Sequence, residues 1–526
     1  MIKYMEALQL LGLRKTTTAV TEDPSQPGVK TKGSFVPKRV DETIVYFSLL
    51  LFGISTGQIQ PSDLIKTSGN TKQYGYYSQI FAKIHLLGVK WQYGLAKACE
   101  LVAAEIKAEE FKLLLMKLAQ VLRLGEDLST FLSQELQAVM HGYITTYERA
   151  MRSLDMLLEM YSTMMSTSSF LVASMALLTM ISGGGDSSQL VVIVTLTILM
   201  GLASFVFMAY YLFPKDRIMI KEGHSDMVKI KKMLMMALGT AASIGISLSF
   251  LNILPIPLVI AIAGVPLILP GLLARKLDAK IRKLDDSYPS FARHLGDVYS
   301  TVGSLGQSLK SVLRSDFGIL NTHIESMTNR VMSRIKIEDA FDLFSKDTGS
   351  VLISAGNDVM SNALVKGANM LQVGSRLSEI TTKFLEIRKK RLQSAKAFES
   401  TIIIMHVLTL AVFSLINRLL NFLAQYFALQ QSVGSEGAAI LSIAAGDTTL
   451  MSMILSLLIV ALSGVNAMAL KVSQGGLFHT IWFNMGVLLG IGGVVVYGVD
   501  IFLDSMIGDI LDITESLEAS AGLGDA

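Results

Sequence analysis

The sequence predicts an all-α polytopic membrane protein in which a charged helical segment followed by membrane-spanning helices occurs twice. The chain of 526 residues is 51% hydrophobic and only 17% charged, whereas a soluble protein usually carries about a quarter charged residues. Long runs without Lys, Arg, Asp or Glu alternate with charged segments in which apolar residues recur at helical spacing. Alternating runs joined by Asn-Gly turns, which are typical of strands, are absent from the sequence.

Four membrane-spanning helices are predicted after the first charged segment. A helix needs about 20 apolar residues to cross the hydrocarbon core, and uncharged runs of that length flank a GGGDSS turn at 183–188. Residues 233–274 form one uncharged run that is long enough for two crossings. We expect it to break near Asn252–Pro257, because proline interrupts a helix. The predicted helices cover about 163–183, 190–213, 233–252 and 256–273.

Three further helices are predicted after the second charged segment, at about 401–427, 449–470 and 478–503, which makes about seven crossings in all. The apolar run at 46–54 is too short to cross, and we interpret it as a buried helix of the first bundle. Apolar residues at three- and four-residue spacing predict another helix over 109–124, which we expect Gly125 to end or bend.

Basic residues predict the orientation of these helices. Lys and Arg gather in 214–232, 275–283 and 388–391, and none occurs in 183–189 or 428–448 or in the acidic C-terminal tail. Because Lys and Arg concentrate on the cytoplasmic side, we predict that both charged segments and the N-terminus are cytoplasmic and that the C-terminus is outside.

The predicted organisation has six parts. They are a flexible N-terminal segment (1–41), a first cytoplasmic helical bundle (42–160), four membrane helices (161–274), a second cytoplasmic bundle (275–400), three membrane helices (401–503) and an acidic extracytoplasmic tail (504–526).

A weak internal match supports a duplication. Leu124-Gly125 followed by Leu128-Ser129 resembles Val373-Gly374 followed by Leu377-Ser378, and two other pairs of segments keep nearly the same offset. These residues lie in LGEDLSTFL at 124–132 and VGSRLSEIT at 373–381, late in each charged segment and ahead of membrane helices.

With these motifs and this layout the chain resembles the type II secretion F-domain family, in the form of archaeal platform proteins of the FlaJ or ArlJ type, which are similar to TadB and TadC. The resemblance covers most of 42–503 and implies two F-domain-like cytoplasmic bundles. It implies a non-enzymatic platform in the cytoplasmic membrane that couples a hexameric secretion ATPase to the insertion of pilin or archaellin subunits into a filament. Whether that filament is an archaellum, an adhesion pilus or another pilus stays open.

Motifs for chemistry are missing. No G-x-x-x-x-G-K-[ST] phosphate loop and no H-E-x-x-H occurs, and the seven histidines are scattered without metal-ligand spacing. The single Cys99 excludes an intramolecular disulfide, and we interpret it as a small buried residue on a helix. We therefore expect no enzyme activity, no cofactor and no metal site. The net charge of +3 is too small to favour nucleic acid as a partner.

Basic residues at the membrane boundary are the candidate contact residues. They either anchor the chain at anionic lipid or dock acidic patches of the ATPase, and both roles are compatible. These residues are Arg388, Lys389, Lys390, Arg391, Lys229, Lys231 and Lys232.

Four residues inside the predicted spans have open roles. Gly486 and Gly490 form G-x-x-x-G, which favours close helix packing, either within the chain or at a homodimer seam. His406 is either a proton relay or a neutral hydrogen-bonded residue. Arg418 either faces the bundle as a functional charge, or snorkels to the interface or pairs with Asp447 or Asp500.

Other function classes compete with the platform. A polytopic transporter or channel is the alternative, although the spans carry few midplane charges and the predicted repeat has four crossings after one segment and three after the other. A membrane receptor with helical cytoplasmic domains is a third possibility, although no sizeable outside sensor is predicted.

Overall fold

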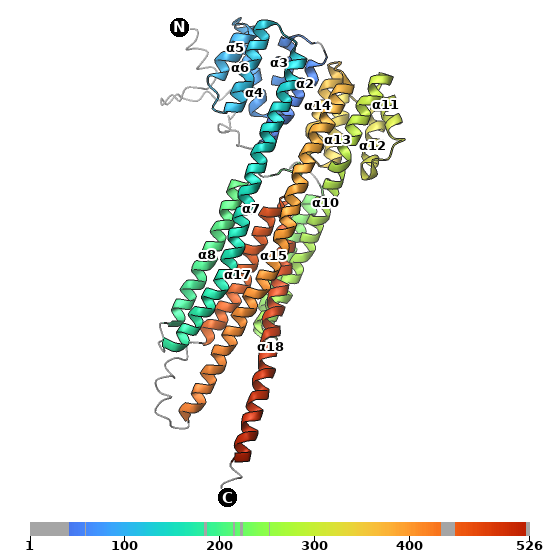
Figure 1. Cartoon of the computed structure of the whole chain (residues 1–526). Helices are drawn as coiled ribbons and strands as arrows, with labels where there is room; N and C mark the ends of the chain where they lie inside the picture. Colours follow the sequence, from blue (N-terminus) through green and yellow to red (C-terminus); the bar gives the residue numbers. More distant parts are fainter. Residues whose placement is uncertain are drawn as a thin grey trace, which may run out of the picture. The chain divides into compact units, whose positions relative to one another are not determined.

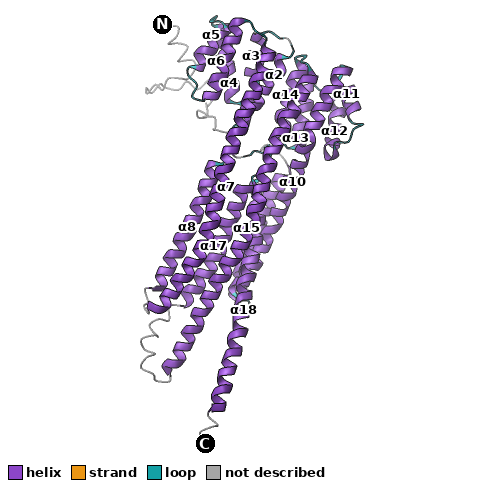
Figure 2. Ribbon diagram, viewed as in Figure 1, coloured by secondary structure: helices purple, strands orange, loops and turns teal. Residues whose placement is uncertain are grey.

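The computed structural model describes most of the chain beyond its N-terminal segment. The described residues are 41–57, 59–182, 187–213, 216–220, 225–251, 253–432 and 448–521. Within them the regular secondary structure is helical (Figure 2), and Met219 and Ser350 form an isolated bridge outside any strand. The all-α prediction is confirmed. The predicted N-terminal segment, except Asp41, and the predicted turn at 183–186 lie outside the described residues.

Six helices form the first bundle. They are α2 (Glu42–Ser55), α3 (Pro61–Asn70), α4 (Tyr76–His85), α5 (Leu95–Ala103), α6 (Glu109–Leu124) and the first part of α7 (Leu128–Ser182), with short turns η1 (Lys72–Tyr74) and η2 (Leu86–Lys90). α2 is buried over 44–55, as predicted, and Phe47 packs against Phe81 and Phe111. Gly125, with φ of 71°, ends α6 as expected.

The second bundle has the same order of helices. It comprises the last part of α10 (Ile256–Val302), α11 (Leu305–Val312), η3 (Gly318–Leu320), α12 (Asn321–Met332), α13 (Ile337–Thr348), α14 (Val351–Val365) and the first part of α15 (Met370–Ser432). In both bundles the first helix packs on the sixth, the second on the third, and the fourth on the fifth. The predicted repeat is therefore confirmed in the order and pairing of its described helices.

The register of the repeat differs from the one that we expected. α5 and α13, and likewise α7 and α15, begin 242 residues apart. The counterpart of Gly125 is then Gly367, which also has a positive φ (65°) between two helices, whereas Gly374 lies inside α15. The expected pairing of Gly125 with Gly374 was wrong by two helical turns. A helix repeats its apolar pattern about every seven residues, so such a shift leaves the sequence match nearly intact.

Six described helices are long and apolar enough to cross a membrane. They are α8 (Ser187–Leu212), α9 (Ser225–Leu251), α10, α15, α17 (Thr448–Gln474) and α18 (Ile481–Ala521), which follows the turn η4 (Phe478–Thr480). The chain is thus a multi-pass membrane protein, and α9 and α10 separate at 252–255 as expected. The remaining predicted span, 163–183, falls at the end of α7, where side chains beyond residue 175 lie outside the described set. The seventh crossing stays a prediction.

Three helices continue from a bundle into the apolar part of the chain without a break. α7, α10 and α15 each run through a predicted domain boundary (Figure 1), at residues 160–161, 274–275 and 400–401. Each bundle is therefore connected to apolar membrane helices by continuous helix and not by a linker.

Candidate functional site: the arginine junction

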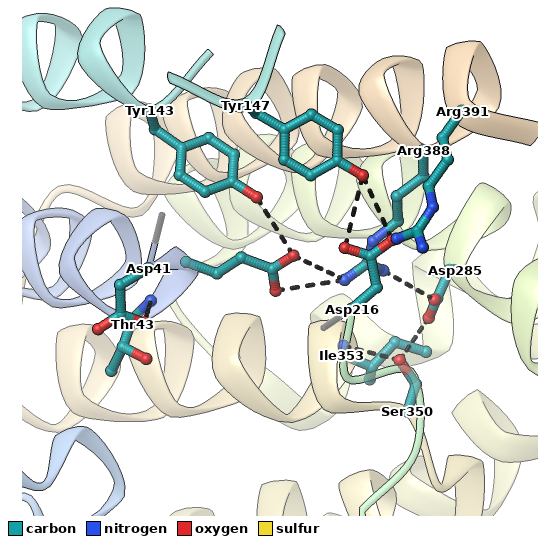
Figure 3. Close-up of polar contacts among 11 residues, drawn as sticks. Asp41, Thr43, Tyr143, Tyr147, Asp216, Asp285, Ser350, Ile353, Arg388 and Arg391 are labelled. Atoms are coloured by element: carbon teal, nitrogen blue, oxygen red, sulfur yellow. Dashed lines mark hydrogen bonds and ion pairs between the residues drawn. The ribbon is translucent and has the colours of Figure 1, made fainter. Parts of the chain in front are cut away.

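One turn of α15 carries two buried arginines, Arg388 and Arg391, which are 8% and 4% exposed. Three residues apart on a helix, they project from neighbouring positions of one face. Glu42, Asp216 and Asp285 approach them from three other segments of the chain. Figure 3 shows Asp216 and Asp285 beside the two arginines. We call these five residues the arginine junction.

Arg388 joins the two bundles. Its Nη2 donates to both carboxylate oxygens of Glu42 on α2, at 3.2 and 3.3 Å, and its Nη1 lies 3.6 Å from Oδ2 of Asp285 on α10. Tyr143 on α7 donates to Glu42 at 3.3 Å, and Ser350 donates to Asp285. One guanidinium therefore holds the first helix of each bundle.

The sequence places Glu42 by starting α2 at that residue. Asp41 is the N-cap, and its carboxylate accepts a hydrogen bond from the backbone N–H of Thr43 at 3.0 Å. The Glu42 carboxylate then lies in the first turn, where the helix dipole favours negative charge. Burial raises the pKa of Glu42, although the charge of Arg388 acts in the opposite direction.

Arg391 joins two connections between membrane helices. Its Nη1 donates to Oδ2 of Asp216, in the α8–α9 connection, at 2.5 Å. Its Nε and Nη2 donate to the backbone carbonyls of Ser473 and Val472, at the end of α17, at 3.0 and 2.8 Å. The guanidinium carbon also lies 4.0 Å from the ring centroid of Phe213, a cation–π distance.

The turn after α17 depends on glycine to approach Arg391. Gly475 has φ of 66°, and a Cβ built on it would lie 2.8 Å from Cζ of Arg391. Any larger residue at position 475 would have to displace the guanidinium of Arg391. It would also have to adopt a left-handed backbone conformation that residues with a Cβ rarely adopt.

The α8–α9 connection is also bound to the second bundle. The N–H of Ile220 donates to the carbonyl of Gly349 at 2.9 Å, and the N–H of Val351 donates to Ile218 at 3.1 Å. Ser350, between these partners, caps α14 by accepting from the N–H of Ile353 at 3.2 Å. The connection thus contacts both bundles, because the hydroxyl of Tyr147 on α7 also donates to Oδ2 of Asp216 at 3.3 Å.

The junction holds three carboxylates against two guanidinium groups. Removing one partner of a buried ion pair typically costs 3–5 kcal/mol, because the remaining charge is left buried and uncompensated. The arrangement offers no nucleophile or bound group for chemistry, and among the described residues no three His, Cys, Asp or Glu side chains are placed to hold a metal ion. What it can do is to keep two bundles and two membrane connections in one geometry.

The predicted basic cluster points in two directions. Arg388 and Arg391 face inward, whereas the side chains of Lys389 and Lys390 are each 66% exposed and pair with Asp286 at 3.5 Å and Glu148 at 3.1 Å. The four residues therefore do not form one surface patch. Lys229, Lys231 and Lys232 are exposed at the start of α9, and Lys229 lies 3.6 Å from Asp226. A contact of the exposed lysines with lipid or ATPase stays a prediction.

The glycines of α18 differ in their surroundings. A Cβ on Gly486 would lie 2.8 Å from the carbonyl oxygen of Gly264 on α10, whereas a Cβ on Gly490 would meet no described atom within 4 Å. Gly492 and Gly493 also make close approaches, since a Cβ on Gly492 would lie 2.8 Å from Cδ1 of Leu410 and a Cβ on Gly493 would clash with the carbonyl of Pro257 on α10. Gly486 thus packs within the chain, in a spacing of seven residues with Gly493. For Gly490 packing of either kind stays a prediction.

His406 joins four helices. It is fully buried, with Nε2 3.1 Å from the carbonyl oxygen of Leu488 and Nδ1 3.0 Å from Nδ2 of Asn466, which accepts from Tyr161. A neutral ring that donates through Nε2 and accepts at Nδ1 satisfies both contacts. This geometry fits the hydrogen-bonded interpretation of His406.

Arg418 pairs with Asp504 on α18, one turn beyond the Asp500 that we considered. Asp500 instead accepts a hydrogen bond from Ser414 at 3.0 Å. Asp447 lies outside the described residues. Cys99 is buried as expected, and burial raises the pKa of its thiol to about 12.

The acidic residues of the arginine junction were not identified from the sequence. Glu42 and Arg388 are 346 residues apart, and Asp216 and Arg391 are 175 apart. No local pattern joins residues so far apart, so only the tertiary structure identifies these pairs.

Comparison with known proteins gives two matches. The chain is similar to flagella accessory protein J of Methanocaldococcus jannaschii, with 24% identity over 497 residues, which cover 89% of this chain and 86% of the relative. It is also similar to flagella accessory protein J of Methanococcus voltae, with 26% identity over 342 residues, or 62% of this chain and 61% of that protein. No family model and no solved structure matches the sequence.

Proposed function

We propose that this chain is a platform protein of the FlaJ type, with F-domain-like bundles, in an archaellum or type IV pilus-like assembly machine of the cytoplasmic membrane. The similarity to two proteins named flagella accessory protein J, one of them over 89% of this chain, supports this function. In this role the chain is not an enzyme. It binds a hexameric secretion ATPase on the cytoplasmic side and passes its movement to the site where pilin or archaellin subunits enter the filament.

The arginine junction is the observation that carries the mechanism. Arg388 holds both bundles, and Arg391 holds two membrane connections, one turn further along the same continuous helix. Packed interiors and rigid helices transmit displacement because they do not deform continuously. A bundle displaced by the ATPase would therefore shift α15 and, through Arg391, the ends of α8 and α17.

The orientation is part of the proposal. The basic residues at 214–232, 275–283 and 388–391 support cytoplasmic bundles and an outside C-terminus. Because Cys99 is buried, single cysteines can be introduced without removing it. An impermeant maleimide should label Met506→Cys in intact cells and should label Lys336→Cys only after lysis. The reverse pattern would overturn the orientation.

The mechanism is tested by separating binding from assembly. The purified full-length chain should bind the secretion ATPase of the same organism, and a homodimer should be visible in the complex. Arg391→Gln should keep ATPase binding within about twofold but reduce filaments per cell at least about tenfold, since a loss near 1.4 kcal/mol of coupling is tenfold. Arg149→Gln is the control, because Arg149 is exposed on α7.

Two outcomes would contradict the proposal. If the wild-type chain neither binds nor stimulates the ATPase, the function loses its mechanism. If Arg391→Gln assembles filaments normally at normal protein level, the junction does not transmit the movement.

A further inference from the structure

Two loops, one in each bundle, share an unusual backbone. We call them the twin loops: residues 91–94, between η2 and α5, and residues 333–336, between α12 and α13. Each has four residues and precedes the fourth helix of its bundle. In the first bundle it follows η2, which continues the third helix α4, and in the second it follows the third helix α12. They are counterparts in the 242-residue register of the repeat.

The second residue of each twin loop is left-handed. Gln92 has φ of 60° and Arg334 has φ of 62°, and in the described part of the chain they are the non-glycine residues with positive φ. At Arg334 the N–H of Ile335 donates to the carbonyl of Arg330 at 3.2 Å, as in the helix ending that usually takes glycine at this place. A strained side chain where glycine would fit, at the same place in both copies, points to a function of the side chains.

The twin loops also expose large apolar side chains. In the first, Val89 just before the loop is 44% exposed and Tyr93 is 42% exposed. In the second, Met332 just before the loop is 45% exposed and Ile335 is 39% exposed. Each loop thus presents two apolar groups to solvent, as protein interfaces do around their centre.

Cations flank these apolar groups, one at the first loop and two at the second. Lys90, Arg334 and Lys336 are exposed, and the described residues provide no carboxylate within ion-pair distance of them. Glu338 and Asp339 follow in the first turn of α13, where the helix dipole stabilises acidic residues without a partner. The complementary surface is an apolar depression with carboxylates at its rim.

We infer that the twin loops are a pair of equivalent docking contacts for one oligomeric protein that presents the same acidic, apolar-centred site on more than one subunit. Because the loops occur twice in one chain, a partner with repeated subunits can engage both, and the second contact is then intramolecular. Under the proposed function, on which this inference rests, the partner is the ATPase.

The experiment measures binding of the full-length chain in detergent micelles to the purified ATPase. Tyr93→Glu or Ile335→Glu alone should weaken binding about tenfold or more, and the double variant should weaken it at least about a hundredfold, because avidity from two linked sites reaches 10²–10⁴. Leu113→Glu is the matched control, since Leu113 is 52% exposed on α6 outside the loops and should change binding less than twofold.

A second set of variants guards against misfolding. Tyr93→Ser and Ile335→Ser remove the apolar groups without adding charge, and Arg334→Gly removes the cation while it suits the left-handed backbone. None of the three should lower the melting temperature below that of the wild type, and all should weaken binding.

The outcomes separate the two proposals. If the wild-type chain does not bind the ATPase, the proposed function fails. If the wild-type chain binds and the double Glu variant binds within twofold of it, the twin-loop inference alone is overturned. It is also overturned if the variants lose binding to anionic phospholipid vesicles but keep binding to the ATPase.

Discussion

The two bundles have the same order of helices but differ in the burial of one arginine on the sixth helix of each. In the 242-residue register Arg149 of α7 is the counterpart of Arg391 of α15. Arg149 is exposed, whereas Arg391 is 4% exposed and binds Asp216 and the end of α17. A duplicated helix order has therefore produced one central helix, α15, and one supporting helix, α7. Both bundles share the helix order, but of these two arginines Arg391 is the one that binds the connections between membrane helices.

The largest predicted difference between the two bundles is the effect of replacing these two arginines. Arg391→Leu should lower the free energy of unfolding by about 3–5 kcal/mol, because Asp216 is left buried without a counter-charge. Arg149→Leu should change it by less than about 0.5 kcal/mol, as is usual for exposed sites. Denaturant unfolding in detergent measures both values, and equal losses would remove the asymmetry.

The second predicted difference concerns how closely the first and sixth helices of each bundle pack together. In the second bundle a Cβ on Gly374 would lie 2.7 Å from the carbonyl of Ala292 and 3.1 Å from Cα of Gly296, so α10 and α15 touch backbone to backbone. The counterpart in α7 is Leu132, which is 1% exposed and fills the space between helices.

Gly374→Ala should therefore destabilise the chain by about 1–3 kcal/mol through overpacking. Leu132→Ala should also destabilise it, but by leaving a cavity, at about 2–5 kcal/mol. A cavity-filling Leu132→Met, expected to cost less than about 1.5 kcal/mol, is the control. A neutral Gly374→Ala would show that the helices can separate freely at this point.

A half-buried carboxyl distinguishes α14 from α6. Burial raises the pKa of Asp358 to about 6, whereas its counterpart in α6, Met116, is 52% exposed. An acid with a raised pKa in the folded state binds protons more tightly there than in the unfolded state. The contribution of Asp358 to stability should therefore fall as pH rises from about 4 to about 6 and stay level above it.

Asp358→Asn should make the pH profile less steep and raise the free energy of unfolding at pH 7 by about 1–3 kcal/mol. Unfolding titrations at about pH 4.5 and about pH 7 measure the change. Asp342→Asn, at an exposed site of α13, should leave the profile unchanged. A wild-type chain that gains stability across the same range would contradict the burial of Asp358.

The smallest effect concerns the strained backbone that both bundles share. Gln92→Gly and Arg334→Gly should each stabilise the chain by about 0.5–1 kcal/mol, because glycine adopts positive φ without a Cβ clash. Similar gains at both positions, seen as similar shifts in melting temperature, would confirm that the loops are structural counterparts. A loss at either position would show that the side chain itself stabilises its loop.

Local physics explains what could be read from the sequence. The membrane helices, the break at 252–255, the burial of α2 and the end of α6 at Gly125 all follow from apolar runs, proline, glycine and helical periodicity within one segment. The duplication could also be inferred, because two similar layouts follow each other along the chain.

Tertiary structure alone decided the register of the repeat and the partners of the arginines. A shift of two turns preserves a helix's apolar pattern, so the sequence could not separate Gly367 from Gly374 as the counterpart of Gly125. Arg388 and Lys389 have nearly equal character in the sequence, yet one is buried against Glu42 and the other is exposed. Which side of a helix faces a carboxylate hundreds of residues away depends on how the whole bundle packs, and that information is not local.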